Sequence, residues 1–334
     1  MAGPSAGMFF AELGARVIKI EPLNGDVTRS WKLVSEDSSK RDSAYYNSIN
    51  YAKESIFLDL KEEKDIMKIH ALLKEADVFT ANFKPGSALK YKLDYQSLST
   101  LNPELIYAQL YGFNASSARL AYDVVMQAET GFLSMTGNNK EELCKMPVAL
   151  IDLIAGHHIK ESVLLALLKR ERFGKGSHIV HSLLHSGLSS LANQASSYLN
   201  LGVVAKPMGT LHPNIAPYGE ICKTADGEQL ILAIGSDQQF SRLLHVLDLE
   251  EVLDTYSTNQ LRLGNRLSLY DLLKQAILNH DFESLHHQFT KLAIPFGHVK
   301  NVQQAMELAE MEGLILENKQ NKSKTITSLP FKFK

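Results

Sequence analysis

Short apolar runs and amphipathic stretches alternate through the first half of the chain. The runs at residues 15–20, 55–60, 77–82 and 105–110 predict strands, whereas residues 62–76 repeat apolar side chains at the helical interval. Strands that alternate with helices indicate a parallel sheet, because each parallel connection needs a crossover. The pattern therefore predicts an α/β protein with a doubly wound, mostly parallel sheet.

The middle of the chain carries two longer helical patterns. The first, residues 153–172, stops at Phe173-Gly174-Lys175-Gly176, after which residues 177–180 resume as a strand. The second, residues 183–199, also ends shortly before a glycine. The Gly- and Pro-rich segment 207–218 that follows is typical of a connection between domains.

These boundaries predict a large domain, a smaller α+β domain and a segment that returns to the first. The large domain covers residues 1–205, the small domain with its linkers 206–305, and the return segment 306–334. Within the small domain we expect a strand at 229–234 and a helix at 238–247. The tail is expected to be loop-like at 318–325 and a strand at 326–334.

Composition narrows the function classes. The 334 residues are 45% hydrophobic and carry a formal net charge of −2, with no basic stretch that would indicate binding to nucleic acid or an anionic membrane. The two cysteines, Cys144 and Cys222, are far apart and form no ligand pattern, so we expect neither a disulfide nor a metal site. No targeting or membrane-spanning segment is recognisable. A cytoplasmic enzyme is the expectation.

An acidic residue interrupts an apolar stretch at Asp152, between Ile151 and Leu153 and directly before the long helical pattern. An ionised carboxylate in apolar surroundings is unfavourable unless hydrogen bonds or a ligand compensate it, which makes Asp152 a candidate for chemistry. The alternative is that Asp152 is an ordinary helix N-cap that accepts hydrogen bonds from the first turn. Position along the chain leaves both interpretations open.

Separated segments across nearly the whole chain resemble the family III CoA-transferases. This group includes formyl-CoA and carnitine CoA-transferases and is homologous to alpha-methylacyl-CoA racemase. The similarity implies a Rossmann-like large domain that binds CoA, and an interlocked homodimer. The segments that carry it are Ala2-Gly3-Pro4, Gly14 to Pro22, Gly25 to Trp31, Asn82 to Gly86, Tyr122-Asp123, Gly131 to Gly137, Ile151-Asp152-Leu153, Arg172 to Gly176, His212 to Tyr218, Ile294 to Gly297 and Pro330 to Phe333.

The resemblance implies that Asp152 is the nucleophile. A carboxylate that attacks an acyl-CoA thioester gives a mixed anhydride and then an aspartyl-CoA thioester, from which CoA passes to an acceptor acid. Each step develops an oxyanion that needs hydrogen-bond donors. Gly209 lies in the segment that takes the place of the family's active-site loop, for which an ordinary interdomain turn is the alternative.

Tyr122 separates the transferases from the racemases in this resemblance. The racemases carry a histidine immediately before the acid that matches Asp123, and use it as one of two bases. Tyrosine has a reference pKa of about 10 and is a poor base near neutral pH, so a transferase is favoured over a racemase. Asp123 matches an acidic position near the acyl group, although an exposed aspartate at a helix start is the alternative.

The resemblance also implies the residues that bind coenzyme A, which serves as co-substrate. They are Arg29, Lys53, Asn82, Phe83, Gly86 and Lys90. Two departures weaken this set: Glu54 stands where the family has an arginine, and Lys90 replaces an arginine, which keeps the charge and loses the planar guanidinium.

Both ends look clipped relative to the family, so a third hypothesis is an inactive relative that binds CoA or only dimerises. The other two are an active CoA-transferase, whose acyl donor and acceptor acid the sequence does not specify, and a racemase-like isomerase. A loose similarity of residues 211–218 and 256–266 to dicarboxylate-using members favours a small carboxylic acid as acceptor.

Overall fold

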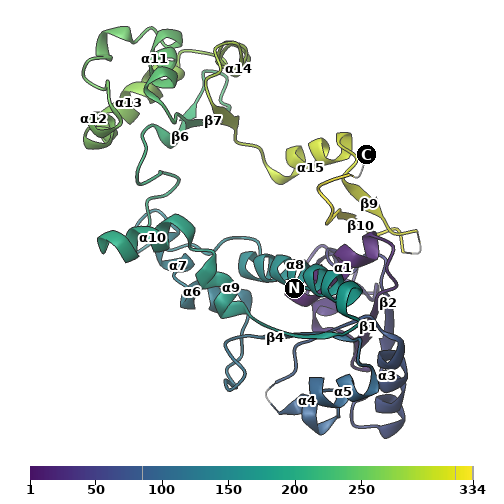
Figure 1. Cartoon of the computed structure of the whole chain (residues 1–334). Coiled ribbons are helices and arrows are strands. Elements are labelled where there is room, and N and C mark those ends of the chain that lie inside the picture. Colours follow the sequence, from purple (N-terminus) through teal and green to yellow (C-terminus); the bar gives the residue numbers. More distant parts are fainter. Residues whose placement is uncertain (85, 320, 333–334) are drawn as a thin grey trace. The chain divides into compact units, whose positions relative to one another are not determined.

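The computed structural model describes residues 1–84, 86–319 and 321–332. The chain forms two compact units. Unit 1 comprises Met1–Ser134, Lys145–Ala205 and Ala309–Lys334, and unit 2 comprises Met135–Cys144 and Lys206–Leu308. The predicted mixed α/β class is confirmed, with parallel sheets in unit 1 and an antiparallel sheet in unit 2 (Figure 1). Within the described residues, no helix combines the length and the apolar character that a membrane span requires.

Unit 1 contains all the parallel strands and the longest helix. Its elements, with α7 and α15 crossing the unit boundaries, are α1 (Ala2–Glu12), β1 (Ile18–Glu21), the 3₁₀ helix η1 (Val27–Ser30), α2 (Ala44–Asn47), β2 (Glu54–Phe57), α3 (Glu63–Glu75), β3 (Val78–Ala81), α4 (Ser87–Lys90), α5 (Tyr95–Leu101), β4 (Ile106–Tyr111), α6 (Asp123–Glu129), α7 (Phe132–Met135), α8 (Leu150–Phe173), β5 (Ser177–Ser182), α9 (Leu183–Ser189), α10 (Ala192–Leu201), α15 (Val302–Met311), β9 (Ile315–Glu317) and β10 (Lys324–Ile326).

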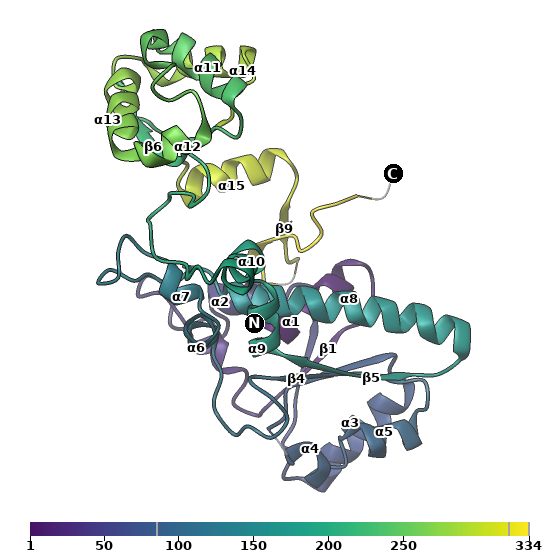
Figure 2. The ribbon, with the colours of Figure 1, turned by 60° about the vertical axis from the view of Figure 1, so that its left-hand side comes forward.

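Strand β4 forms the centre of a parallel sheet with the order β3, β4, β5. It is buried on both faces because its alternate side chains enter two different cores. Ile106, Ala108 and Leu110 pack with α1 and α8, whereas Tyr107 packs with α3 and α5 on the other side (Figure 2). Strands β1 and β2 pair in parallel as a separate two-stranded sheet. The sheet therefore carries α8 on one face along its length.

Two predictions about element bounds are wrong. The single helix expected at 183–199 is broken between α9 and α10, because Ser189 and Ser190 hydrogen bond through their hydroxyls to the Ser186 carbonyl and compete with the backbone. The strand expected at 326–334 ends at Ile326 in β10, which pairs with β9. Beyond it, Thr327 and Ser328 bond instead to Glu12, and residues 333–334 lie outside the described residues.

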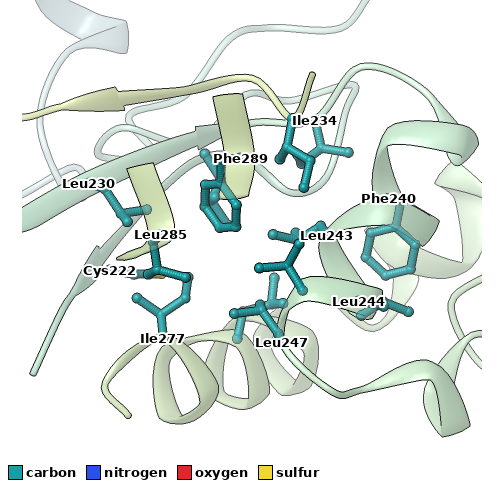
Figure 3. Close-up of a cluster of buried hydrophobic side chains, with 14 of the residues drawn as sticks. Cys222, Leu230, Ile234, Phe240, Leu243, Leu244, Leu247, Ile277, Leu285 and Phe289 are labelled. Atoms are coloured by element: carbon teal, nitrogen blue, oxygen red, sulfur yellow. The ribbon is translucent and has the colours of Figure 1, made fainter. Parts of the chain in front are cut away.

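Unit 2 is built around a three-stranded antiparallel sheet and one apolar core. Alternate residues of β7, Leu230 and Leu232, enter this core together with Phe240 and Phe289 from the covering helices (Figure 3). The described elements are β6 (Tyr218–Lys223), β7 (Gln229–Ala233), α11 (Asp237–Val246), η2 (Glu250–Val252), α12 (Asn259–Gly264), α13 (Arg266–Ile277), α14 (Phe282–Lys291) and β8 (Phe296–His298). The order of the strands is β6, β7, β8.

Candidate functional site

Asp152 is the third residue of α8 and lies in its first turn. Its side chain is 14% exposed, and the Met1 amino group approaches Oδ2 at 3.2 Å. Burial raises the pKa of Asp152, the nearby amino group opposes that shift, and the charge of Asp123 adds to it. The N-cap interpretation of Asp152 is wrong, because the cap residue is Ala149 and no side chain of α8 caps its own helix.

Helix α1 lies directly against the start of α8, and a glycine permits this contact. Gly156 is one turn after Asp152, and a Cβ atom there would lie 2.2 Å from Ser5 Oγ and 3.1 Å from the Ala2 carbonyl oxygen. A Cβ atom at that distance would force Ser5 to change its rotamer or the helices to separate, so glycine lets the two helices approach this closely without such a change. The approach brings the first residue of the chain to the candidate nucleophile.

Asp123 begins α6, yet its carboxylate bonds to a different helix. Oδ1 accepts hydrogen bonds from the backbone amides of Ile151 at 2.7 Å and Asp152 at 3.2 Å. Oδ2 accepts one from Gln127 Nε2 at 2.6 Å. The expectation of an exposed aspartate that caps its own helix is therefore wrong, since this side chain caps α8.

The segment that carries Tyr122 and Asp123 lies over the end of β4. A Cβ atom on Gly112, directly after β4, would lie 2.2 Å from the Cβ of Ala121, so the glycine admits the segment at this point. Tyr122 is 57% exposed and is the N-cap residue of α6. Tyr122 is thus adjacent in sequence to Asp123 and open to solvent.

Tyr45, which the sequence did not single out, also belongs to the surroundings of Asp152. Its ring makes an edge contact with Trp31, with centroids 5.0 Å apart. Burial raises the pKa of the Tyr45 phenol, and the negative charges of Asp152 and Asp123 raise it further. The Tyr45 hydroxyl thus lies within electrostatic range of the two carboxylates, which favour its protonated form.

Arg29 is held by an internal network. Its Nε and Nη2 donate to Glu21 at 2.7 Å each, Nη1 bonds to Asp42, and Nη2 also reaches the Tyr46 hydroxyl at 2.6 Å. The guanidinium stacks on the Tyr46 ring at 3.8 Å from the centroid. With 8% of the residue exposed, a phosphate of CoA would have to displace a carboxylate to reach it. Contact with phosphate remains a prediction for Arg29.

Lys53 is likewise turned inward. Its Nζ donates to the carbonyl oxygens of Pro4 and Ile49 at 2.6 Å and to Asn50 Oδ1 at 2.9 Å, which uses all three protons of the ammonium group. Burial lowers the pKa of Lys53 to about 7. Glu54, which the sequence suggested would repel phosphate, forms a two-point ion pair with Arg16 at 2.9 and 3.0 Å.

The remaining predicted CoA residues lie together after β3. Asn82 and Lys90 are exposed, whereas Phe83 packs against the core on the α3 and α5 side of the sheet. Gly86 has φ +76° and is the N-cap residue of α4, a backbone conformation that suits glycine. This segment follows the carboxyl end of a parallel strand, which is the edge where doubly wound sheets bind ligands.

Gly209 belongs to unit 2. It has φ +61° in the turn between Met208 and Leu211, and its amide donates to the Gly137 carbonyl at 2.7 Å. Thr210 is anchored next to it by a hydrogen bond of 2.6 Å to the Gly219 carbonyl. The loop is thus ordered by contacts within its own unit.

The structure therefore brings together two of the predicted catalytic residues, Asp152 and Asp123, and the predicted CoA residues Asn82, Phe83, Gly86 and Lys90 follow β3 in one segment. Sequence reasoning missed Gln127 and Tyr45. A glutamine four residues after an aspartate on a predicted helix is a usable signal for Gln127. Nothing in the local sequence marks Tyr45.

The parallel β/α units of unit 1, with a mostly buried aspartate in the first turn of the longest described helix, place the protein in the α/β class. The family model described as CoA-transferase family III matches residues 1–334. The chain belongs to this family. CoA thioesters are substrates of such enzymes, and the predicted enzyme class, CoA-transferase, is confirmed.

Individual relatives support this membership. The chain is 36% identical over 313 residues to the succinate--glutarate CoA-transferase of Agrobacterium fabrum, covering 91% of this chain and 78% of that protein. It is 32% identical over 325 residues to the succinyl-CoA:glutarate CoA-transferase of Homo sapiens, covering 95% and 73%. A crystal structure of a CAIB/BAIF family protein from Brucella suis matches with a TM-score of 0.87 at 34% identity, covering 100% of this chain and 89% of that one.

Proposed function

We propose that this enzyme transfers CoA from succinyl-CoA to a small dicarboxylic acid such as glutarate, with Asp152 as the nucleophile. The observation that carries the proposal is the position of Asp152: a carboxylate 14% exposed, in the first turn of α8, with a raised pKa. A desolvated carboxylate is a stronger nucleophile than a hydrated one, and the fold holds it at a helix start.

The reaction proceeds by two exchanges at Asp152. A carboxylate oxygen attacks the thioester carbonyl and expels the CoA thiolate, which leaves a mixed anhydride. The thiolate then attacks the Asp152 carbonyl carbon, releases the donor acid and forms the aspartyl-CoA thioester. The acceptor carboxylate repeats both steps in reverse, so that the thioester energy is kept and Asp152 is regenerated.

The oxyanions of these steps need donors other than the first-turn amides of α8. The amides of Ile151 and Asp152 already donate to Asp123, so they are not free to stabilise a developing negative charge. The family resemblance assigns that stabilisation to the segment of Gly209, and this role stays a prediction.

The proposed acceptor class follows from the relatives. The names of those with assigned acids specify glutarate, oxalate, mesaconate or D-citramalate, all of which carry two carboxylates. Glutarate is the acceptor or partner acid in the relatives at 36% and 32% identity. We therefore place glutarate first among the acids to be tested.

CoA is proposed to bind at the segment from Asn82 to Lys90. The exposed Asn82 and Lys90 offer a donor and a positive charge, and Phe83 offers an aromatic edge. Arg29 and Lys53 are engaged in internal hydrogen bonds and would contact CoA only if those bonds were exchanged for bonds to phosphate. A fall in CoA affinity on substitution of Lys90, without loss of stability, tests this assignment.

The enzyme is further proposed to act as an interlocked homodimer. Large apolar side chains are exposed along α8, β5 and α10, and β5 pairs with only one strand among the described residues. Light scattering after gel filtration measures the assembly, and Leu165→Glu with Leu168→Glu is expected to weaken it. The exposed set is Leu164, Leu165, Leu168, Phe173, Val180, Tyr198, Leu199 and Leu201.

Hydroxylamine trapping tests the nucleophile. Incubation with succinyl-CoA and hydroxylamine should convert Asp152 to a hydroxamate, detected by mass spectrometry of its peptide, and Asp152→Asn should abolish transfer to glutarate. Asp77→Asn is the matched control, since Asp77 is 73% exposed and pairs with Arg170. A wild-type enzyme that transfers CoA without any adduct at Asp152 would overturn the proposal.

A further inference from the structure

The carboxylate of Asp123 is the only side-chain cap that the described residues provide for α8. The first amides of an α-helix have no partner within the helix, and Ala149 at the N-cap position has no polar side chain to serve them. Asp123 Oδ1 accepts from two of these amides, those of Ile151 and Asp152, across 28 and 29 positions of sequence. The cap therefore acts on the backbone of the candidate nucleophile itself.

Gln127 holds this cap in place. It is 1% exposed and lies one turn after Asp123 on α6. Its Nε2 donates to Asp123 Oδ2 at 2.6 Å, while its Oε1 accepts from the Met146 amide at 2.8 Å. Both ends of the approach to α8, Met146 and Ile151, are thus tied to one short helix.

We propose that Asp123 is a positioning residue that fixes the first turn of α8, and through it the aim of Asp152, and that Gln127 fixes Asp123 in turn. The inference rests on the proposed function of Asp152 as nucleophile. Both oxygens of Asp123 are engaged with protein donors, which leaves no oxygen committed to the acyl group. Asp123 would thus set the geometry of the first turn of α8 rather than contact the substrate.

A general structural role does not explain these contacts, because α8 has other anchors. Ile151, Ala155, Ile159 and Val163 are almost fully buried in the core shared with α1 and β4. Loss of the cap should therefore leave the helix folded and loosen only its first turn. A displacement of the nucleophile by about 1 Å is enough to lower a rate by about 10²-fold.

The charge of Asp123 gives a second, independent effect. A negative charge beside Asp152 disfavours ionisation of the nucleophile and contributes to its raised pKa. Asp123→Asn keeps one oxygen for the amides of α8 but removes the charge, so the nucleophile should ionise at lower pH. Gln127→Met keeps the charge and removes the hydrogen bond that holds it. The two variants therefore separate geometry from charge.

The experiment measures kcat and KM for transfer from succinyl-CoA to glutarate as a function of pH, together with the rate of hydroxamate formation at Asp152. Asp123→Ala should lower kcat about tenfold to a hundredfold while KM changes little. Asp123→Asn should recover part of kcat and shift the acidic limb of the profile to lower pH. Gln127→Met should lower kcat without moving that limb.

Asp281→Ala is the control for the loss of an aspartate cap as such. Asp281 caps α14 in unit 2 through a hydrogen bond of 2.8 Å to the Ser284 amide, and its loss should leave kcat unchanged. Circular dichroism and thermal melting check folding of every variant. Should Asp123→Ala not fold, Asp123→Asn and Gln127→Met still decide the question.

The outcomes are distinguishable. Equal hydroxamate rates in wild type, Asp123→Asn and Gln127→Met would overturn the positioning role. A rise in KM with unchanged kcat would also overturn it and would indicate direct contact with substrate. Absence of the adduct in the wild-type enzyme would instead overturn the proposed function.

Discussion

Both carboxylate oxygens of Glu21 accept hydrogen bonds from the guanidinium of Arg29, and the pair is almost fully buried. Such a geometry gives a bidentate ion pair, with Tyr46 completing it through its hydroxyl and its ring. The pair joins β1 to η1, so Arg29 connects the sheet with the segment that leads to Trp31.

Arg29→Ala should lower the free energy of unfolding by about 3–5 kcal/mol, because it leaves Glu21 buried without its partner. Urea denaturation followed by circular dichroism measures the change. Arg16→Ala, which breaks the exposed pair with Glu54, should change it far less, because that pair is screened by solvent. An Arg29→Ala enzyme of normal stability with a raised KM for succinyl-CoA would show instead that Arg29 serves CoA.

The acid stability of the enzyme should depend on Glu21. Burial opposes ionisation of Glu21, but its hydrogen bonds with Arg29, the Asp26 amide and Tyr46 prevail and lower its pKa to about 2. The resulting stabilisation is present above the ordinary glutamate value of 4.5 and is lost as the pH falls from there towards 2. Urea denaturation between pH 6 and pH 3 should show wild type losing about 2 kcal/mol from this source. The same series on Glu21→Gln should lack this loss.

Asp152→Asn should make the protein more stable at pH 7 while it abolishes turnover. Because the pKa of Asp152 is raised in the folded state, protonation of its side chain stabilises the fold as the pH falls. Above that pKa the side chain is charged, and its burial is unfavourable. Removal of the charge should raise the free energy of unfolding by on the order of 1 kcal/mol, measured as a higher Tm. A lower Tm would show that the pairing with the Met1 amino group outweighs burial.

Gly156→Ala should disturb Asp152 from one helical turn away. The added methyl group would meet Ser5 Oγ, so Ser5 must change its rotamer or α1 and α8 must separate, at an expected loss of about 1–3 kcal/mol. We expect the rate of hydroxamate formation at Asp152 to fall with it. Gly174→Ala is the control, because a Cβ there meets nothing within 4 Å, although its φ of +64° adds a small backbone strain of its own.

Local patterns predicted much of the framework. The predicted runs agree with β2, β3, β4 and β5 to within a few residues, because buried strands leave short runs of apolar residues. The break between α9 and α10 was missed, since it depends on serine hydroxyls that compete for a carbonyl rather than on apolar spacing.

The site was predictable as a set of residues and not as a set of contacts. Asp152 is marked by its apolar neighbours, and Asp123 by the family motif. The hydrogen bonds between them, and the closure of Arg29 on Glu21 and Asp42, join segments that only the tertiary fold brings together. A propensity or a spacing contains no information about such partners.

Glu12 is the last residue of α1, and Met1, the N-cap residue of the same helix, pairs with Asp152. The Glu12 carboxylate accepts three hydrogen bonds from Thr327 and Ser328, which follow it by 315 and 316 positions. Contacts of such sequence separation form late, because the whole intervening chain must be closed first. Helix α1 can pack against α8 and β4 without these bonds, so the contacts between Glu12 and residues 327–328 are expected to be among the last of unit 1 to form.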